Sequence, residues 1–292
     1  MKKGITSAAY LKSEDYSFCM SRAKKHGFDC LDYQGFLCND SGLFTMCAAD
    51  WDKKLSRLLS AAKENGMSFF QCHGPWRYPP EDGPEERIER FDKMSRSIVG
   101  AAALECPNIV IHPLFPYGWD DTEHGKETFE INVEFFSRLC EIGKQYGVTV
   151  CIENMPAVGS PLKIPADVLE LVKTIGSPNC RFCLDTGHST MESGALSPAN
   201  AVRLVGKEYL AVMHVHDNMG QFDEHLLPGT GIIDWDAYCA SLREIGYDGV
   251  FNCETRVDYD DPALADQYEA EEKALADTII RLADAASGAE RP

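Results

Sequence analysis

Six acidic or histidine side chains lie at the ends of short apolar runs, where polar residues are least expected. The runs are SFFQCHG (68–74), NIVIHPL (108–114), VTVCIEN (148–154), RFCLDTGH (181–188), AVMHVHD (211–217) and GVFNCET (249–255). An isolated charge beside a buried strand is costly unless it is paired or binds a metal ion. These six residues therefore predict one shared polar site: His73, His112, Glu153, Asp185, His214 and Glu254.

Carboxylates and imidazoles together suit hard to borderline divalent ions, which include Mn²⁺, Mg²⁺, Co²⁺ and Zn²⁺. One residue from each of four neighbouring runs is predicted to bind a single ion, with positions left open for substrate oxygens: Glu153, Asp185, His214 and Glu254. Further candidates hold a second metal or contact substrate: His73, His112, His188, Asp223 and His225. His216 and Asp217 are expected to orient His214 from behind.

Two more apolar runs, at 2–8 and 29–35, raise the number of predicted strands to eight. Segments of helical period lie between strands, at 51–66, 85–105, 126–147, 165–176, 197–206 and 234–247. Eight strand and helix alternations with apolar strands predict a single-domain (β/α)8 barrel over residues 1–292, closed by a C-terminal helix at 258–287. An open doubly wound sheet would need a Gly-rich phosphate loop after the first strand, and ITSAAYLKSED contains none. In a barrel the strand ends surround one cavity, so the six residues form a ring.

The charge balance limits the partners. The chain has 28 Lys+Arg and 46 Asp+Glu, a net charge of 28 − 46 = −18. Nucleic-acid binding depends on cationic surfaces, and the largest Lys/Arg clusters are the pairs at 24–25 and 53–54. Such a chain is expected to avoid nucleic acid and anionic membranes, and to act on small neutral or metal-chelating molecules.

The sequence predicts a cytoplasmic protein. No segment reaches the ~20 apolar residues that span a bilayer, and the N-terminus lacks the apolar stretch of a signal peptide. Its 12 cysteines are scattered without CxxC pairs, as expected of buried free thiols in a reducing compartment. The C-terminal helix is expected to pack on the barrel or on another subunit, so a homo-oligomer stays open.

Five motifs give the chain a family resemblance: IENMP (152–156), CLDTGH (183–188), HVHDN (214–218), DEHLLPGTGIIDW (223–235) and CETR (253–256). Together they resemble the xylose isomerase-like barrels, also called the AP endonuclease family 2 superfamily. This group includes ketose 3-epimerases, hydroxypyruvate isomerase, inosose dehydratase and endonuclease IV. The resemblance extends from the first strand to about residue 255.

In the epimerase and isomerase branch, the resemblance implies one Mn²⁺-like ion bound by the residues matching Glu153, Asp185, His214 and Glu254. It also implies that Glu153 and Glu254 are acid/base groups that move a proton through a metal-stabilised enediolate of a keto-sugar or polyol. Substrate contacts are predicted for four residues: His188, His73, Trp76 and Arg256. Trp76 belongs to a set of loop aromatics placed to wall a cavity, with Phe115, Tyr117 and Trp119.

Two other reactions remain open on the same scaffold. A lyase of the inosose dehydratase type would share the proton abstraction and then expel a leaving group. The endonuclease branch binds three metal ions through nine ligand residues. This chain has a matching residue for each of the nine, which makes His112, Asp223 and His225 candidates for a second metal ion. The ketose 3-epimerase pattern itself departs at two places, because Gly159 and Gly220 replace a substrate-binding Glu and an Arg.

Overall fold

The computed structural model describes residues 1–11, 13–77, 82–156, 161–191, 196–255 and 265–288. Within these ranges eight parallel strands form one sheet: β1 (Lys2–Thr6), β2 (Cys30–Tyr33), β3 (Ser68–His73), β4 (Asn108–Ile111), β5 (Thr149–Glu153), β6 (Cys180–Asp185), β7 (Leu210–His214) and β8 (Val250–Cys253). Six of them lie inside a run predicted from the sequence, and β6 and β7 each begin one residue before theirs.

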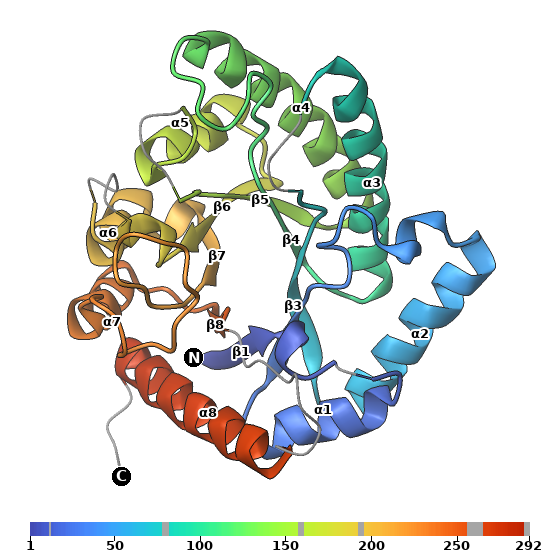
Figure 1. Ribbon diagram of the computed structural model, residues 1–292, viewed down its shortest axis with the longest axis vertical. Helices are drawn as coiled ribbons and strands as arrows, with labels where there is room; N and C mark the ends of the chain where they lie inside the picture. Colours follow the sequence, from blue (N-terminus) through green and yellow to red (C-terminus); the bar gives the residue numbers. More distant parts are fainter. Residues whose placement is uncertain (12, 78–81, 157–160, 192–195, 256–264, 289–292) are drawn as a thin grey trace.

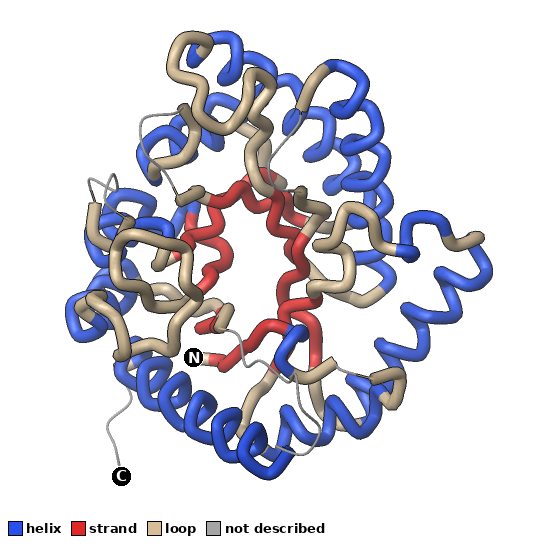
Figure 2. The backbone as a smooth tube through the Cα atoms, in the orientation of Figure 1, coloured by secondary structure: helices blue, strands red, loops and turns tan. Residues whose placement is uncertain are grey.

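The sheet curls into a barrel. Strands follow the order β7-β6-β5-β4-β3-β2-β1-β8, so each strand from β1 to β7 pairs with its neighbours in the chain, and β1 also pairs with β8. Between β7 and β8 the ladder is reduced to a parallel bridge of Val215 and Cys253. Figure 2 shows the resulting ring of strands inside a ring of helices. The predicted single-domain (β/α)8 barrel is confirmed.

Eight α-helices within the described ranges cover the barrel (Figure 1): α1 (Tyr16–Lys25), α2 (Ala48–Glu64), α3 (Pro84–Ala103), α4 (Gly125–Tyr146), α5 (Pro165–Ile175), α6 (Pro198–Tyr209), α7 (Trp235–Ile245) and α8 (Ala265–Ser287). Sequence patterning singled out all of them except α1, whose buried face consists only of Tyr16, Cys19, Met20 and Ala23. The predicted terminal helix is observed from Ala265, and residues 258–264 lie outside the described residues.

Helix α8 packs against the barrel of its own chain. Figure 1 shows it lying across the outside of β1 and β8, between α7 and α1. Leu275, Ile279 and Leu282 are buried at spacings of three and four, the pattern of a helix with one apolar face. The apolar face of α8 is therefore covered by the barrel of the same chain.

The apolar core lies mainly between the strands and the surrounding helices, and a second, small cluster lies apart from it. The small cluster consists of Val110, Cys151, Cys183 and Val212 on β4 to β7. All 12 cysteines are free and ten of them are buried, as expected of small apolar side chains. Among the described residues, no helix combines the length and apolar character that a membrane crossing requires.

The packing of α4 generates a stability prediction. Phe136 is fully buried in the main core, whereas Tyr146 on the same helix is 48% exposed. We expect Phe136→Ala to lower the free energy of unfolding by ~3–5 kcal/mol, because it removes buried apolar surface and leaves a cavity. Tyr146→Ala should change it by less than ~1 kcal/mol. Denaturant unfolding of the two variants tests this, and equal losses would contradict the assignment of α4 to the core.

Candidate metal centre

Strand alternation places the predicted residues in one layer inside the barrel. Successive side chains of a strand point to opposite faces, so residues two apart share a face. The inner cluster residues Cys151, Cys183 and Val212 are each followed two positions later by a site residue, namely Glu153, Asp185 and His214. A floor of small apolar side chains therefore lies directly below a polar layer at the carboxyl ends of the strands, where barrel enzymes carry their active sites.

The four residues predicted to bind one ion converge. Glu153, Asp185, His214 and Glu254 each offer one ligand atom, and these atoms all lie within 4.8 Å of one another. His214 Nδ1 lies 2.8 Å from Glu153 Oε1 and 3.2 Å from Glu254 Oε2. Three carboxylates and one imidazole aimed at one point are a donor set that fits a divalent cation.

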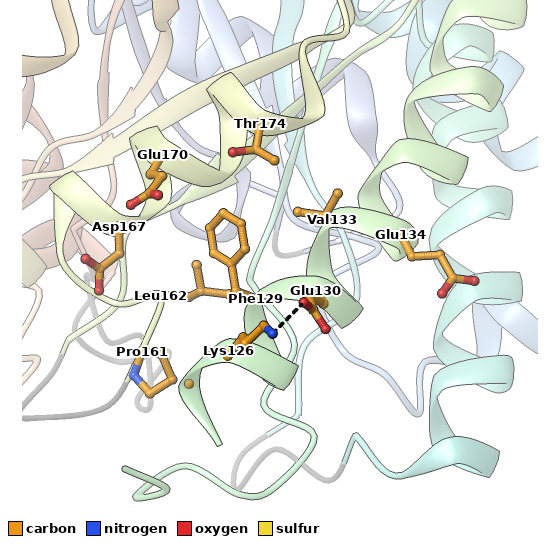
Figure 3. A pocket seen from close by; sticks show the side chains of 11 residues that line it. Lys126, Phe129, Glu130, Val133, Glu134, Pro161, Leu162, Asp167, Glu170 and Thr174 are labelled. Carbon is orange, nitrogen blue, oxygen red and sulfur yellow. Dashed lines mark ion pairs between the residues drawn. The ribbon is translucent and has the colours of Figure 1, made fainter. Parts of the chain in front are cut away.

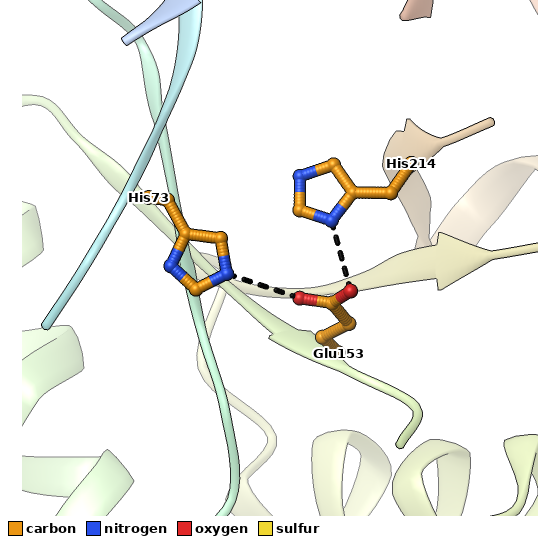
Figure 4. A group of neighbouring side chains, drawn as sticks. All are labelled: His73, Glu153 and His214. Atoms are coloured by element: carbon orange, nitrogen blue, oxygen red, sulfur yellow. Dashed lines mark hydrogen bonds and ion pairs between the residues drawn. The ribbon is translucent and has the colours of Figure 1, made fainter. Parts of the chain in front are cut away.

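Glu153 connects this group to a second one. Its Oε2 lies 3.4 Å from His73 Nε2 and 3.0 Å from His112 Nε2, while its Oε1 faces His214 (Figure 4). The ring of His73 is fixed because its Nδ1 donates to the Gly74 carbonyl at 2.7 Å, which leaves Nε2 to face the carboxylate. Glu153 Oε2 is buried and accepts no well-aligned hydrogen bond. An orphaned buried oxygen between two imidazole nitrogens fits a cation position.

Burial and neighbouring charges set the protonation of this group. Burial lowers the pKa of His112 to about 4, so this imidazole is neutral at pH 7. Burial alone raises the pKa of Glu153, but the charges and hydrogen bonds of His214 and His112 together outweigh burial and hold that pKa well below its usual value. Glu153 is therefore ionised, as a metal ligand or a general base must be.

A third group surrounds the carboxylate of Asp223. The Nε2 atoms of His188, His216 and His225 lie 3.5, 3.7 and 3.2 Å from its oxygens. Each of these rings has its Nδ1 next to a backbone carbonyl, that of Asn154 at 2.8 Å, Asp217 at 3.2 Å and Glu254 at 2.8 Å, respectively. A carbonyl only accepts hydrogen bonds, so every Nδ1 carries a proton and every Nε2 faces Asp223.

In the group of Asp223, His188, His216 and His225, protonated imidazoles supply the positive charge beside the carboxylate. Burial lowers the pKa of His225, but its hydrogen bond to Asp223 and the charges of the surrounding carboxylates together outweigh burial and raise the pKa to about 9. The pKa of His188 is likewise raised to about 10, against the effect of burial, by Asp185 and Asp223. His225 also adopts φ 50°, a left-handed conformation that costs energy outside glycine and is common at functional sites.

His216 and Asp217 do not contact His214 in the predicted way. His216 Nε2 lies 3.0 Å from Asp185 Oδ2, and a Cβ at Gly187 would collide with its ring. Gly187 has ordinary helical φ and ψ, so the glycine is required for this close approach and not for its backbone conformation. Asp217 instead accepts from Trp235 Nε1 at 2.9 Å and from the Gly229 amide at 2.9 Å, which anchors the DEHLLPGTGIIDW segment.

A cavity of about 430 Å³ opens above the three groups. Its described lining includes His73, His112, Glu153, His188, Asp223, His225 and Glu254, with walls of Leu37, Trp76, Trp119, Met155 and Phe222. Trp76 packs edge-on against His112, with ring centroids 4.4 Å apart. Of the other predicted aromatics, Phe115 is buried beneath Trp119, whereas Tyr117 stacks on His124 away from the cavity. Arg256 lies outside the described residues.

Another cavity, of about 660 Å³, lies outside the barrel between α4 and α5 (Figure 3). Its floor is apolar, with Phe129, Val133 and Leu162, and carboxylates lie around its rim. Among its described lining residues there is no histidine or cysteine, and no ligand group like those in the barrel. The chemistry therefore belongs to the barrel cavity.

Two polar residues that sequence reasoning missed support the site from β2. Asp32 Oδ2 lies 3.1 Å from His214 Nε2, and Gln34 Nε2 donates to Glu254 Oε1 at 2.7 Å. Both belong to the predicted strand DCLDYQG (29–35), and their spacing of two places them on one face. That alternation was the available signal, because Asp32 lies within the run and Gln34, which directly follows β2, is neither acidic nor a histidine.

Proton competition at His214 generates a pH prediction. Burial alone lowers the pKa of His214, but Cys183 and the nearby carboxylates, those of Glu153 and Glu254 among them, together outweigh it and raise that pKa well above its usual value. A cation on Nδ1 must displace this proton, so affinity falls as pH decreases. Between about pH 6 and about pH 8 we expect Mn²⁺ to bind about tenfold more tightly per pH unit for each displaced proton.

Calorimetric titration in two buffers of different ionisation enthalpy measures the affinity and counts the protons released. Binding without proton release and with pH-independent affinity would contradict protonation of His214 in the metal-free chain.

The comparisons with known proteins agree with the fold. The family described as Xylose isomerase-like TIM barrel matches residues 20–280. An uncharacterized protein of Methanocaldococcus jannaschii is 29% identical over 262 residues, covering 88% of this chain and 84% of that protein. D-psicose 3-epimerase of Agrobacterium fabrum is 22% identical over 235 residues, covering 79% and 75%.

A solved structure of D-psicose 3-epimerase with D-tagatose from Clostridium cellulolyticum superposes with a TM-score of 0.76 at 20% identity, covering 97% of this chain and 99% of that one. At this identity the superposition supports the fold alone, whereas the family match spans most of the chain. The resemblance predicted from the five motifs is thereby confirmed. The chain belongs to the xylose isomerase-like TIM-barrel family.

Proposed function

We propose that this protein is a divalent-metal-dependent isomerase or epimerase of a keto-sugar or polyol. One observation carries the proposal: carboxylate oxygens of Glu153 and Glu254 lie 2.8 and 3.2 Å from His214 Nδ1, and both residues line the cavity. Two carboxylates beside one cation position can remove a proton from a substrate carbon and return it. The similarity to D-psicose 3-epimerase supports the same class of reaction.

Glu153, Asp185, His214 and Glu254 would hold the ion. A bound divalent ion supplies charge stabilisation for oxygens of a substrate that chelates it. One glutamate takes the proton from the carbon next to the carbonyl, which leaves an enediolate, and the other glutamate returns it. Return to the opposite face of the same carbon gives epimerisation, and return to the neighbouring carbon gives isomerisation.

The two glutamates are held differently. Glu153 is 1% exposed and has imidazoles on both oxygens, whereas Glu254 is 13% exposed and is fixed by Gln34. The more exposed Glu254 is better placed to meet substrate entering from the cavity. We assign His188, His73 and Trp76 to substrate contacts because all three line the same cavity. Arg256 stays a predicted contact.

Manganese is the ion we propose, with magnesium, cobalt or zinc as alternatives suited to the same ligands. The candidates for a second ion fall into two groups, since His112 contacts His73 and Glu153 while Asp223 and His225 contact each other. The acidic chain and the free cysteines support a cytoplasmic enzyme that acts on a small molecule, without nucleic acid or membrane partners. A homo-oligomer remains part of the proposal.

Proton exchange tests the proposed reaction. A panel of keto-sugars and polyols is incubated with the Mn²⁺-loaded protein in D₂O and followed by NMR. We expect deuterium at the carbon beside the carbonyl, and a rate ~10²–10⁴-fold lower in Glu254→Gln, which removes a proton-transfer group. Glu141→Gln on the exposed face of α4 is the matched control and should keep the wild-type rate.

Turnover that leaves every substrate C–H intact would overturn the proposal. Formation of an unsaturated product in the same tubes would assign the chain to the lyase alternative, in which a leaving group departs from the enediolate.

A second candidate, metal-dependent phosphodiester hydrolysis at abasic DNA, is favoured by one observation. All nine residues that match the endonuclease ligands lie in the three contiguous groups. The net charge of −18 opposes it, because DNA binding requires cationic surface. We therefore expect no nicking of an abasic duplex at low salt with Zn²⁺, assayed on a denaturing gel. Nicking that His214→Ala abolishes would establish this second activity.

A further inference from the structure

Strand β2 carries a buried carboxylate that the proposed reaction does not use. Asp32 is 0% exposed and pairs in register with Gln71 of β3, one layer below the metal site. Its Oδ2 lies 3.1 Å from His214 Nε2, 3.1 Å from Gln71 Nε2 and 3.3 Å from Asn252 Nδ2. Its Oδ1 is buried without a hydrogen bond.

Four other strands of the barrel show that this layer does not need a charge. At the same depth β4 to β7 place the small apolar cluster Val110, Cys151, Cys183 and Val212. A buried carboxylate with one unsatisfied oxygen costs stability relative to such side chains. Asp32 therefore has a role other than core packing. Its contact with His214 Nε2 indicates that this role concerns the imidazole of His214.

Asp32 decides which nitrogen of His214 is available. A carboxylate only accepts hydrogen bonds, so His214 must donate its Nε2–H to Asp32. Glu153 and Glu254 attract a proton to Nδ1 from the other side, at 2.8 and 3.2 Å. Once a cation displaces the Nδ1 proton, the imidazole is neutral and carries one proton, and with Asp32 present that proton belongs on Nε2. Nδ1 is then a lone pair aimed at the three carboxylates.

Gln34 gives the same kind of support to the next ligand. Its amide donates to Glu254 Oε1 at 2.7 Å, which leaves Glu254 Oε2 facing His214 Nδ1. The backbone N–H of Gln34 donates to Ser7 Oγ at 2.8 Å, which fixes the main chain at this residue. Two residues of one β2 segment thus orient two ligands contributed by β7 and the end of β8.

We propose that Asp32 is a positioning residue that fixes His214 in its Nε2–H tautomer and so makes Nδ1 a metal ligand. The inference rests on the metal site of the proposed function and is independent of its substrate. Carboxylates that accept from a ligating imidazole orient the ring and increase its basicity in metal sites generally.

Manganese titration is the first test. Free Mn²⁺ is followed by electron paramagnetic resonance at fixed pH, on protein shown to be folded by circular dichroism. We expect Asp32→Asn to weaken Mn²⁺ binding ~10–100-fold. Gln71→Met is the matched control, because it perturbs the same buried layer and touches Asp32 without contacting His214 in the described structure. It should stay within about threefold of wild type. Asp32→Ser replaces Asp32→Asn if the latter does not fold.

The tautomer supplies a second readout that a purely structural role would not change. In ¹⁵N-histidine-labelled, Zn²⁺-loaded protein, long-range ¹H–¹⁵N spectra distinguish a protonated Nε2 from a metal-bound Nδ1, and His214→Gln assigns the signals. Wild type and Gln71→Met should show His214 with Nε2–H, and Asp32→Asn should lose this pattern.

The outcomes separate the two proposals. Wild-type affinity and an unchanged tautomer in Asp32→Asn would overturn the role of Asp32 alone, as would equal effects of Asp32→Asn and Gln71→Met. Metal binding that depends on Asp32, in a protein that exchanges no substrate proton, would overturn the proposed function alone. Absence of any Mn²⁺ or Zn²⁺ binding by the wild-type chain would overturn both.

Discussion

The burial of Glu153 is the constraint on which the rest of the site depends. A carboxylate with 1% exposure at the centre of a barrel is stable only when positive or donating groups surround it. His214 faces one of its oxygens, and His73 and His112 face the other. Each oxygen of the Glu153 carboxylate therefore faces a different candidate cation position, and the two positions are adjacent because they share this side chain.

Backbone carbonyls then decide what the imidazoles can do. His73, His188, His216 and His225 all place Nδ1 against a carbonyl, so their Nε2 atoms are directed inward. His214 has the reverse orientation, because its Nε2 faces Asp32 and its Nδ1 faces the carboxylates. This orientation follows from a side chain of β2, whereas the other four follow from backbone carbonyls, adjacent in sequence for His73 and His216 and remote in sequence for His188 and His225.

Most of the fold and much of the site could be predicted from the sequence. The eight strands follow from apolar runs, and the layer of site residues follows from period-two alternation once the strands close into a barrel. Helix α1 was missed because its apolar face is short. Asp32 and Gln34 were missed because their partners, His214 and Glu254, are separated from them by 182 and 220 residues. Contacts across the barrel depend on register and rotamer, which local patterns do not encode.

The charge of the chain and the residues that line the cavity together limit the class of substrate that can bind there. Among its described lining residues there is no lysine or arginine, and Gly220, where the ketose 3-epimerase pattern has an arginine, lies in a turn with φ 89°. A net charge of −18 raises the local concentration of divalent cations and repels anions. Trp76 and Trp119 offer flat apolar faces beside the carboxylates. A cavity that concentrates metal ions, repels phosphate and presents aromatic faces is suited to a neutral polyhydroxylated substrate, which binds through its own oxygens and the apolar face of its ring.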